Sequence, residues 1–276
     1  MIRWLGQLVA LPLKILLIVV SIVPIFDRLV LYRAIWALTG DPYYARNLVL
    51  LLAQRQGLET ARTFAEEAFI ACPDGSIAAM IGQLELDLGF DPDRAAMWLH
   101  RAKEHPDLGN PDGLLLLELS LSQHFPEMDR GRIVESILNR RDVSMDLTRV
   151  ALLVQAQLDL KAGQWDKAGL TAERLLAISE VPPAHWILWV AYSGLHETDY
   201  AAYEFQQLSS TTLGPLYQAI IASGYHLLGD ASRCREHLLE CRKAGIPDRY
   251  ILWNDPDLIG PLTELGPQME SSETVS

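Results

Sequence analysis

The sequence predicts an all-α protein in which one transmembrane helix precedes a solenoid of about six helical hairpins. Three observations predict it. The chain opens with a long apolar run, a pattern of paired helices then returns about every 35 residues, and no stretch alternates apolar and polar residues as strands do. We expect an anchor with an interfacial helix at 1–40, the solenoid at 41–265 and a disordered acidic tail at 266–276.

The composition is that of a globular protein with an acidic surface. Of the 276 residues, 50% are hydrophobic and 21% are charged, and the formal net charge is −12. An acidic surface repels phosphate backbones, so the sequence predicts no nucleic-acid partner. We interpret the surplus of acid as a source of solubility.

The apolar run at residues 4–26 is the candidate membrane span. As a helix it would extend about 34 Å, enough to cross a bilayer. Lys14 near its middle costs about 3 kcal/mol, and Pro12 and Pro24 also oppose insertion, but each Leu, Ile, Val or Phe contributes about 0.3–0.6 kcal/mol in favour. No small-x-small cleavage site follows Val23, which argues against a signal peptide. A buried core helix is the remaining alternative.

Basic residues on either side of this run predict its orientation. Arg3 lies before it, whereas Arg28, Arg33 and Arg46 follow it, so the positive-inside tendency places the solenoid in the cytoplasm of a single-pass protein.

Residues 28–39 fit two interpretations. They could form an amphipathic helix at the membrane interface, with Tyr32 and Trp36 at headgroup level. They could equally form a helix that covers the first repeat.

The repeating pattern is an apolar helix, a short turn containing Gly or Asp, an alanine-rich helix and then Pro. Small residues are needed where the helices of a pair cross closely, and glycine permits the tight turn between them. The expected pairs begin near Pro42, Ser76, Pro111, Leu147, Pro183 and Leu213.

Three of these repeat units carry small, glycine and aromatic residues at specific positions. The second contains Gly82, Gly89, Ala95 and Ala102; the fourth contains Gly163, Trp165 and Ala168; the sixth contains Ala222, Tyr225, Gly229, Cys234 and Cys241. With these residues the chain resembles tetratricopeptide (TPR) repeat proteins over residues 41–262, although the third and fifth units match mainly by length. The resemblance implies a right-handed α-solenoid that binds a protein or peptide partner and is not an enzyme.

The end of the solenoid has its own signals. Asn254 or Asp255 is placed to cap a helix with Pro256 in its first turn. We expect this last helix to run to about Leu265 and to cover the apolar face of the final hairpin.

A search for catalytic and metal-binding motifs favours neither chemistry. Cys234, His237 and Cys241 share one helical face and are types that bind soft metals, but the two cysteines occupy positions where the repeat needs small buried residues. The three cysteines, Cys72, Cys234 and Cys241, have no spacing typical of a disulfide framework, which indicates a reducing compartment. We therefore predict no metal and no cofactor.

The aromatic stretch of the fifth unit is the candidate binding element. Trp186, Trp189 and Tyr192 lie close to one helical face. They could pack in the core, or they could line a groove for a peptide, because Trp and Tyr often anchor interfaces.

These observations favour a membrane-anchored scaffold for protein–protein interaction, with an unidentified partner, in the assembly or quality control of a membrane complex. One alternative is a structural protein that forms homo-oligomers. The other is an enzyme subunit with a site between helices, which would involve His185 or His196.

Overall fold

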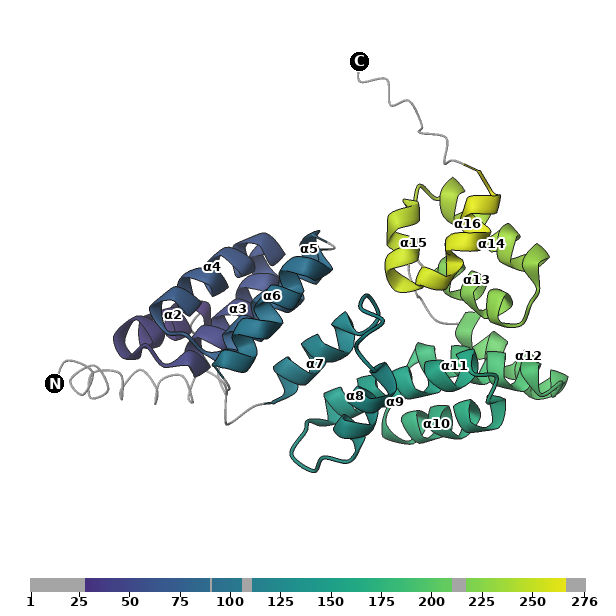
Figure 1. Ribbon diagram of the computed structural model, residues 1–276, viewed down its shortest axis with the longest axis horizontal. Helices are drawn as coiled ribbons and strands as arrows, with labels where there is room; N and C mark the ends of the chain where they lie inside the picture. The colour runs from purple at the N-terminus through teal and green to yellow at the C-terminus, as the bar shows by residue number, and fades with distance from the viewer. Residues whose placement is uncertain (1–27, 90, 106–110, 210–216, 267–276) are drawn as a thin grey trace, which may run out of the picture. The chain divides into compact units, whose positions relative to one another are not determined.

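The structure is a computed structural model that describes residues 28–89, 91–105, 111–209 and 217–266 (Figure 1). The chain divides into two compact units, Met1–Ser144 and Met145–Ser276. In the described ranges both units consist of helices and contain no β-strand. The all-α prediction is therefore confirmed.

In the described part of unit 1, a single helix comes first and three hairpins follow. Its described helices are α2 (Arg28–Thr39), then α3 (Pro42–Gln56) with α4 (Leu58–Ala71), α5 (Gly75–Gly89) with α6 (Pro92–Glu104), and α7 (Asp112–Leu121) with α8 (Arg130–Leu138).

Unit 2 has three hairpins followed by short closing helices. They are α9 (Met145–Lys161) with α10 (Trp165–Ile178), α11 (Pro182–Gly194) with α12 (Thr198–Ser209), α13 (Tyr217–Leu227) with α14 (Ala231–Lys243), then α15 (Asp248–Asn254), the 3₁₀ helix η1 (Pro256–Leu258) and α16 (Ile259–Glu264). Five hairpins begin within two residues of their expected positions, and the sixth expected start, Leu213, lies outside the described residues.

Aspartates and glycines define where the helices begin. The carboxylates of Asp91, Asp129 and Asp230 each accept a hydrogen bond at 3.0 Å from the backbone N–H three residues further on. Gly163 and Gly229, in the turns before α10 and α14, have φ values of +68° and +75°, which side chains disfavour. These local signals explain why the hairpin boundaries could be predicted.

Small residues allow the helices of each unit to approach closely. The repeat positions Ala95, Ala102, Ala168, Ala222, Cys234 and Cys241 are all buried. A Cβ atom on Gly82 would lie 2.5 Å from Leu117 Cδ2. On Gly224 it would lie 2.8 Å from Trp189 Cη2 and 3.1 Å from Trp186 Nε1. Contacts that short force the neighbouring atoms to move. At Gly82 the neighbour is the end of a leucine side chain, whereas at Gly224 it is two indole rings of the core, so Gly224 is the position that depends more strongly on glycine.

Helix α2 packs on the first hairpin. Ile35 is fully buried, the Trp36 ring lies edge-on to Phe64 with centroids 5.1 Å apart, and Tyr32 lies 5.8 Å from Tyr44. This packing is what a helix covering the first repeat requires. Between residues 28 and 266, the described helices include none with the length and apolarity to span a bilayer. The predicted span at 4–26 and all but the first residue of the predicted tail lie outside the described residues.

The closing helices cover the end of unit 2. Asp255 is the cap, since its carboxylate accepts a hydrogen bond from the N–H of Asp257 at 3.2 Å. Leu258 and Leu262 are buried against α14. Arg242 of α14 donates to both carboxylate oxygens of Asp248, at 3.1 and 2.7 Å, and so ties α14 to α15.

The first prediction concerns Gly224. In Gly224→Ala the new methyl group collides with the Trp189 indole, so we expect the free energy of unfolding to fall by about 1–3 kcal/mol in urea denaturation. Gly169→Ala is the matched control, because its Cβ would lie 4.0 Å from Ala191 Cβ. That control should leave stability unchanged or raise it by up to about 1 kcal/mol. Equal effects of the two substitutions would contradict the packing described.

The second prediction concerns the thiols. Burial raises the pKa of Cys234 and of Cys241 to about 11, whereas Cys72 is partly exposed. Because the thiolate is the reactive form, iodoacetamide at pH 8 should modify Cys72 in the folded protein and leave the other two intact. All three should react after unfolding in urea. Peptide mass spectrometry reads out each site, and modification of Cys234 or Cys241 at the rate of Cys72 would contradict their burial.

Candidate functional site

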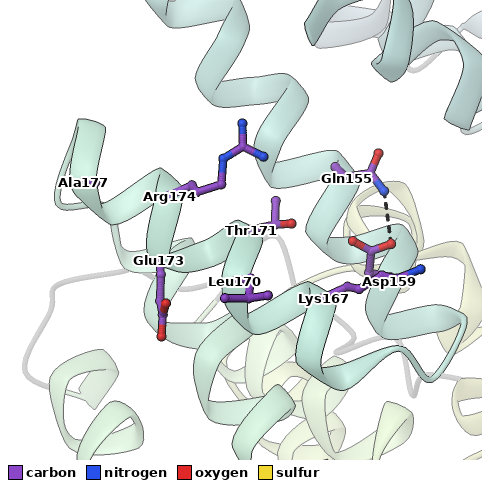
Figure 2. A pocket seen from close by; sticks show the side chains of 8 residues that line it. All are labelled: Gln155, Asp159, Lys167, Leu170, Thr171, Glu173, Arg174 and Ala177. Carbon is purple, nitrogen blue, oxygen red and sulfur yellow. Dashed lines mark hydrogen bonds between the residues drawn. The ribbon is translucent and has the colours of Figure 1, made fainter.

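A groove with a volume of about 730 Å³ lies on the first hairpin of unit 2, between α9 and α10 (Figure 2). Six of its eight lining residues have polar side chains, yet most of the surface that lines it is apolar. The lining residues are Gln155, Asp159, Lys167, Leu170, Thr171, Glu173, Arg174 and Ala177.

Helix α9 contributes an amide and a carboxylate one turn apart. Gln155 Nε2 donates a hydrogen bond to Asp159 Oδ1 at 3.1 Å. Asp159 is buried, and this bond satisfies one of its oxygens in the interior. Within the described residues, the Gln155 carbonyl oxygen and the second Asp159 oxygen accept no hydrogen bond, so both could accept one from a ligand.

Helix α10 contributes cations and a hydroxyl. Lys167, Thr171 and Arg174 follow one another at spacings of four and three, so they share one side of the helix. Figure 2 shows Thr171 and Arg174 on the side that faces α9. Thr171 is buried, yet within the described ranges neither its hydroxyl nor the exposed Arg174 guanidinium has a polar partner. Leu170, 62% exposed, adds an apolar contact surface.

Glu173 connects this groove to a second surface. Its side chain points away from Arg174 in Figure 2 and accepts a hydrogen bond from the Tyr192 hydroxyl at 3.2 Å. Burial, and then the charge of Glu173, raise the pKa of Tyr192. Tyr192 lies 5.5 Å from Tyr200, ring to ring, and Tyr200 and Tyr203 of α12 are 62% and 57% exposed. We call Tyr192, Tyr200 and Tyr203 the tyrosine surface.

The two tryptophans do not line a groove, which corrects that part of the sequence-based hypothesis. Trp186 and Trp189 are 6% and 5% exposed and belong to the core of unit 2. Trp186 Nε1 donates to the Ile220 carbonyl at 2.8 Å, and Trp189 packs against Phe205 and Tyr225. They fill the space above Gly224, whereas Tyr192 reaches the surface.

Sequence reasoning missed Tyr200, Tyr203 and the groove. One signal was available, because Tyr200 and Tyr203 are three apart in an amphipathic helix and therefore share one of its faces. The groove residues gave no comparable signal, since they are ordinary polar residues of a helix surface.

The two histidines considered for an enzyme site lie apart along the chain. His185 Nδ1 is 2.7 Å from Glu204 Oε2, joining the start of α11 to α12. His196 is exposed in the turn after α11 and has a φ of +63°.

The candidate metal ligands of α14 are arranged for packing. His237 Nδ1 lies 2.6 Å from Gln218 Oε1, and its ring stacks on Tyr225 with centroids 5.5 Å apart. Cys234 and Cys241 point into the core. Within the described part of the chain, no three His, Cys, Asp or Glu side chains are grouped so that they could hold a metal ion.

Comparisons with known proteins identify the fold. The sequence matches no protein-family model and no curated protein. The crystal structure of PilW, described as a widely conserved type IV pilus biogenesis factor, is similar with a TM-score of 0.53 at 16% identity, over 80% of this chain and 96% of that chain. A tetratricopeptide repeat protein from Parabacteroides merdae has a TM-score of 0.50 at 14% identity, over 85% and 91% of the two chains. At such identities the likeness shows the fold, and the chain has a TPR-like helical repeat fold.

Proposed function

We propose that this protein is a non-catalytic, membrane-anchored scaffold that binds a polypeptide partner in the groove between α9 and α10. The observation that carries the proposal is a pair of polar groups on the groove side of α10, Arg174 and Thr171, which have no polar partner among the described residues. A TPR-like stack of hairpins supports it, because such repeats offer extended surfaces for binding.

The groove residues suit an extended peptide. A peptide backbone has carbonyl acceptors and N–H donors that water otherwise satisfies. Arg174 and Lys167 can donate to carbonyl or carboxylate oxygens, and Gln155 can accept from an N–H. Leu170 and Ala177 offer apolar contact for a side chain of the partner. The groove therefore holds both kinds of contact that an interface uses.

Anchoring through residues 4–26 would hold the scaffold at a membrane, with its hairpins in the cytoplasm. Tethering raises the effective concentration of the groove toward membrane proteins. We propose a role in the assembly or quality control of a membrane complex. PilW, which shares the fold at 16% identity, is described as a pilus biogenesis factor.

The third prediction tests the groove by photo-cross-linking in cells. A photoreactive residue at Leu170 should capture a discrete polypeptide, because this exposed side chain lines the groove. The added substitution Arg174→Ala should reduce the captured amount by about tenfold, as expected for loss of a hydrogen bond to a charged group.

The control position is Ile70 on α4, which is exposed and lies in unit 1. It should not capture the same polypeptide. Equal capture at both positions, or no capture at Leu170, would refute groove binding. Capture of a second copy of this chain would favour the homo-oligomer instead.

The fourth prediction tests the anchor by deleting residues 1–27. The deletion stops before α2, because Ile35 and Trp36 are needed to cover the first hairpin. The full chain should stay in the membrane fraction after a carbonate wash, and the shortened chain should leave it. If both forms leave the membrane, or both stay, residues 4–26 do not anchor the protein.

A further inference from the structure

Unit 2 carries an exposed aromatic surface surrounded by carboxylates. Tyr200 and Tyr203 are neighbours on α12 and lie mostly in solvent, and Tyr192 reaches Tyr200 from the end of α11. Tyrosine is enriched in protein interfaces because its ring is apolar and its hydroxyl is polar. Two exposed tyrosines one turn apart, one of which contacts the partly buried Tyr192, therefore indicate a binding surface.

The charges around these rings are negative and largely unpaired. Glu173, Glu197 and Asp199 have no cationic partner within the described residues. Glu204 is paired with His185. Glu173, Glu204 and Glu197 are all close enough to oppose ionisation of the Tyr192 hydroxyl.

Some other carboxylates of the described chain do have a cationic partner. Buried Glu85 of α5 lies 2.8 Å from Arg94 and 3.5 Å from Arg62. Glu118 of α7 lies 2.5 Å from Lys103. There the chain supplies its own cation, whereas Glu173, Glu197 and Asp199 have none among the described residues.

We propose that the tyrosine surface, with Glu173 and Glu197, binds a basic segment of the polypeptide partner. A Lys or Arg side chain can lie over a tyrosine ring while its charge meets the carboxylates, so both features act on one ligand group. Arg has the better fit, because its planar guanidinium also stacks on aromatic rings.

Charge decides between a partner and a second copy of this chain. The net charge of −12 makes two copies repel one another, whereas a basic segment is attracted. Glu173 also lines the groove between α9 and α10, so a segment in that groove could continue onto the tyrosine surface. The inference thus rests on the proposed function and specifies the chemistry of its partner.

The test uses the full chain in mild detergent and a fluorescein-labelled peptide of alternating Arg and Gly, read by anisotropy. We expect binding that weakens as salt rises, and no binding of the matching Glu and Gly peptide. The double substitution Tyr200→Ala and Tyr203→Ala should weaken binding by about tenfold or more, and Phe at both positions should retain most of it. Glu173→Gln with Glu197→Gln should weaken binding and reduce its dependence on salt.

The matched controls lie in unit 1: Tyr43→Ala, which removes another half-exposed tyrosine, and Glu135→Gln, which removes another exposed carboxylate. Both should bind the Arg peptide as the unchanged protein does. Three results would overturn the inference: no binding of the Arg peptide, equal binding of the Glu peptide, or equal weakening by the controls. Dimerisation that is lost in the Tyr200→Ala and Tyr203→Ala variant would overturn it as well.

The outcomes are separable from those of the cross-linking experiment. Suppose that Leu170 captures a polypeptide but the tyrosine substitutions do not change binding of the Arg peptide. That result would support the proposed scaffold and refute binding of a basic segment at the tyrosine surface. Specific binding of the Arg peptide without capture at Leu170 would instead refute binding in the groove between α9 and α10.

Discussion

The close approach of helices at positions without a side chain is the constraint on which the rest of unit 2 depends. Gly224 leaves room for the indoles of Trp186 and Trp189, and these two rings fill the core between α11 and α13. Because the rings are held there, α12 packs on α11 through Phe205 and keeps its tyrosines in solvent. In unit 1, Gly82 lets Leu117 approach α5 in the same way. Gly224 thus makes room for the two aromatic residues that fill the core of unit 2.

Local signals predicted the hairpins, and long-range packing explains what they missed. Asp91 before Pro92 and the glycine at 163 could be interpreted from neighbouring residues alone. Helical spacing placed Trp189 and Tyr192 together, but their burial differs because Gly224, far along the chain, accepts one ring and not the other. Predicting the groove would have required knowing that Arg174 and Thr171 have no polar partner among the described residues, which only the folded hairpin shows. The repeat pattern also runs through residue 144 without marking the division into two units.

The charges of unit 2 are arranged differently on its two surfaces. The groove presents Arg174 and Lys167 beside the buried Asp159, whereas the described charges that act on Tyr192 of the tyrosine surface are the carboxylates of Glu173, Glu204 and Glu197. Glu173 belongs to both, so a single polypeptide crossing it would meet donors first and acceptors afterwards. Such an order of charges favours one direction of binding, because the reversed peptide would place like charges together. Little rearrangement is needed, since both surfaces are built on helices packed against the core.

Hydroxyl-radical footprinting of the intact chain, free and bound to the polypeptide captured at the groove, tests binding through unit 2 most directly. The method labels exposed tyrosine and leucine side chains, so Leu170, Tyr200 and Tyr203 report on the two surfaces, while Tyr43 and Leu50 of α3 serve as internal references. We predict protection of the first three residues in the complex and unchanged labelling of the references. Protection of Tyr43 and Leu50 with no change in unit 2 would contradict the account.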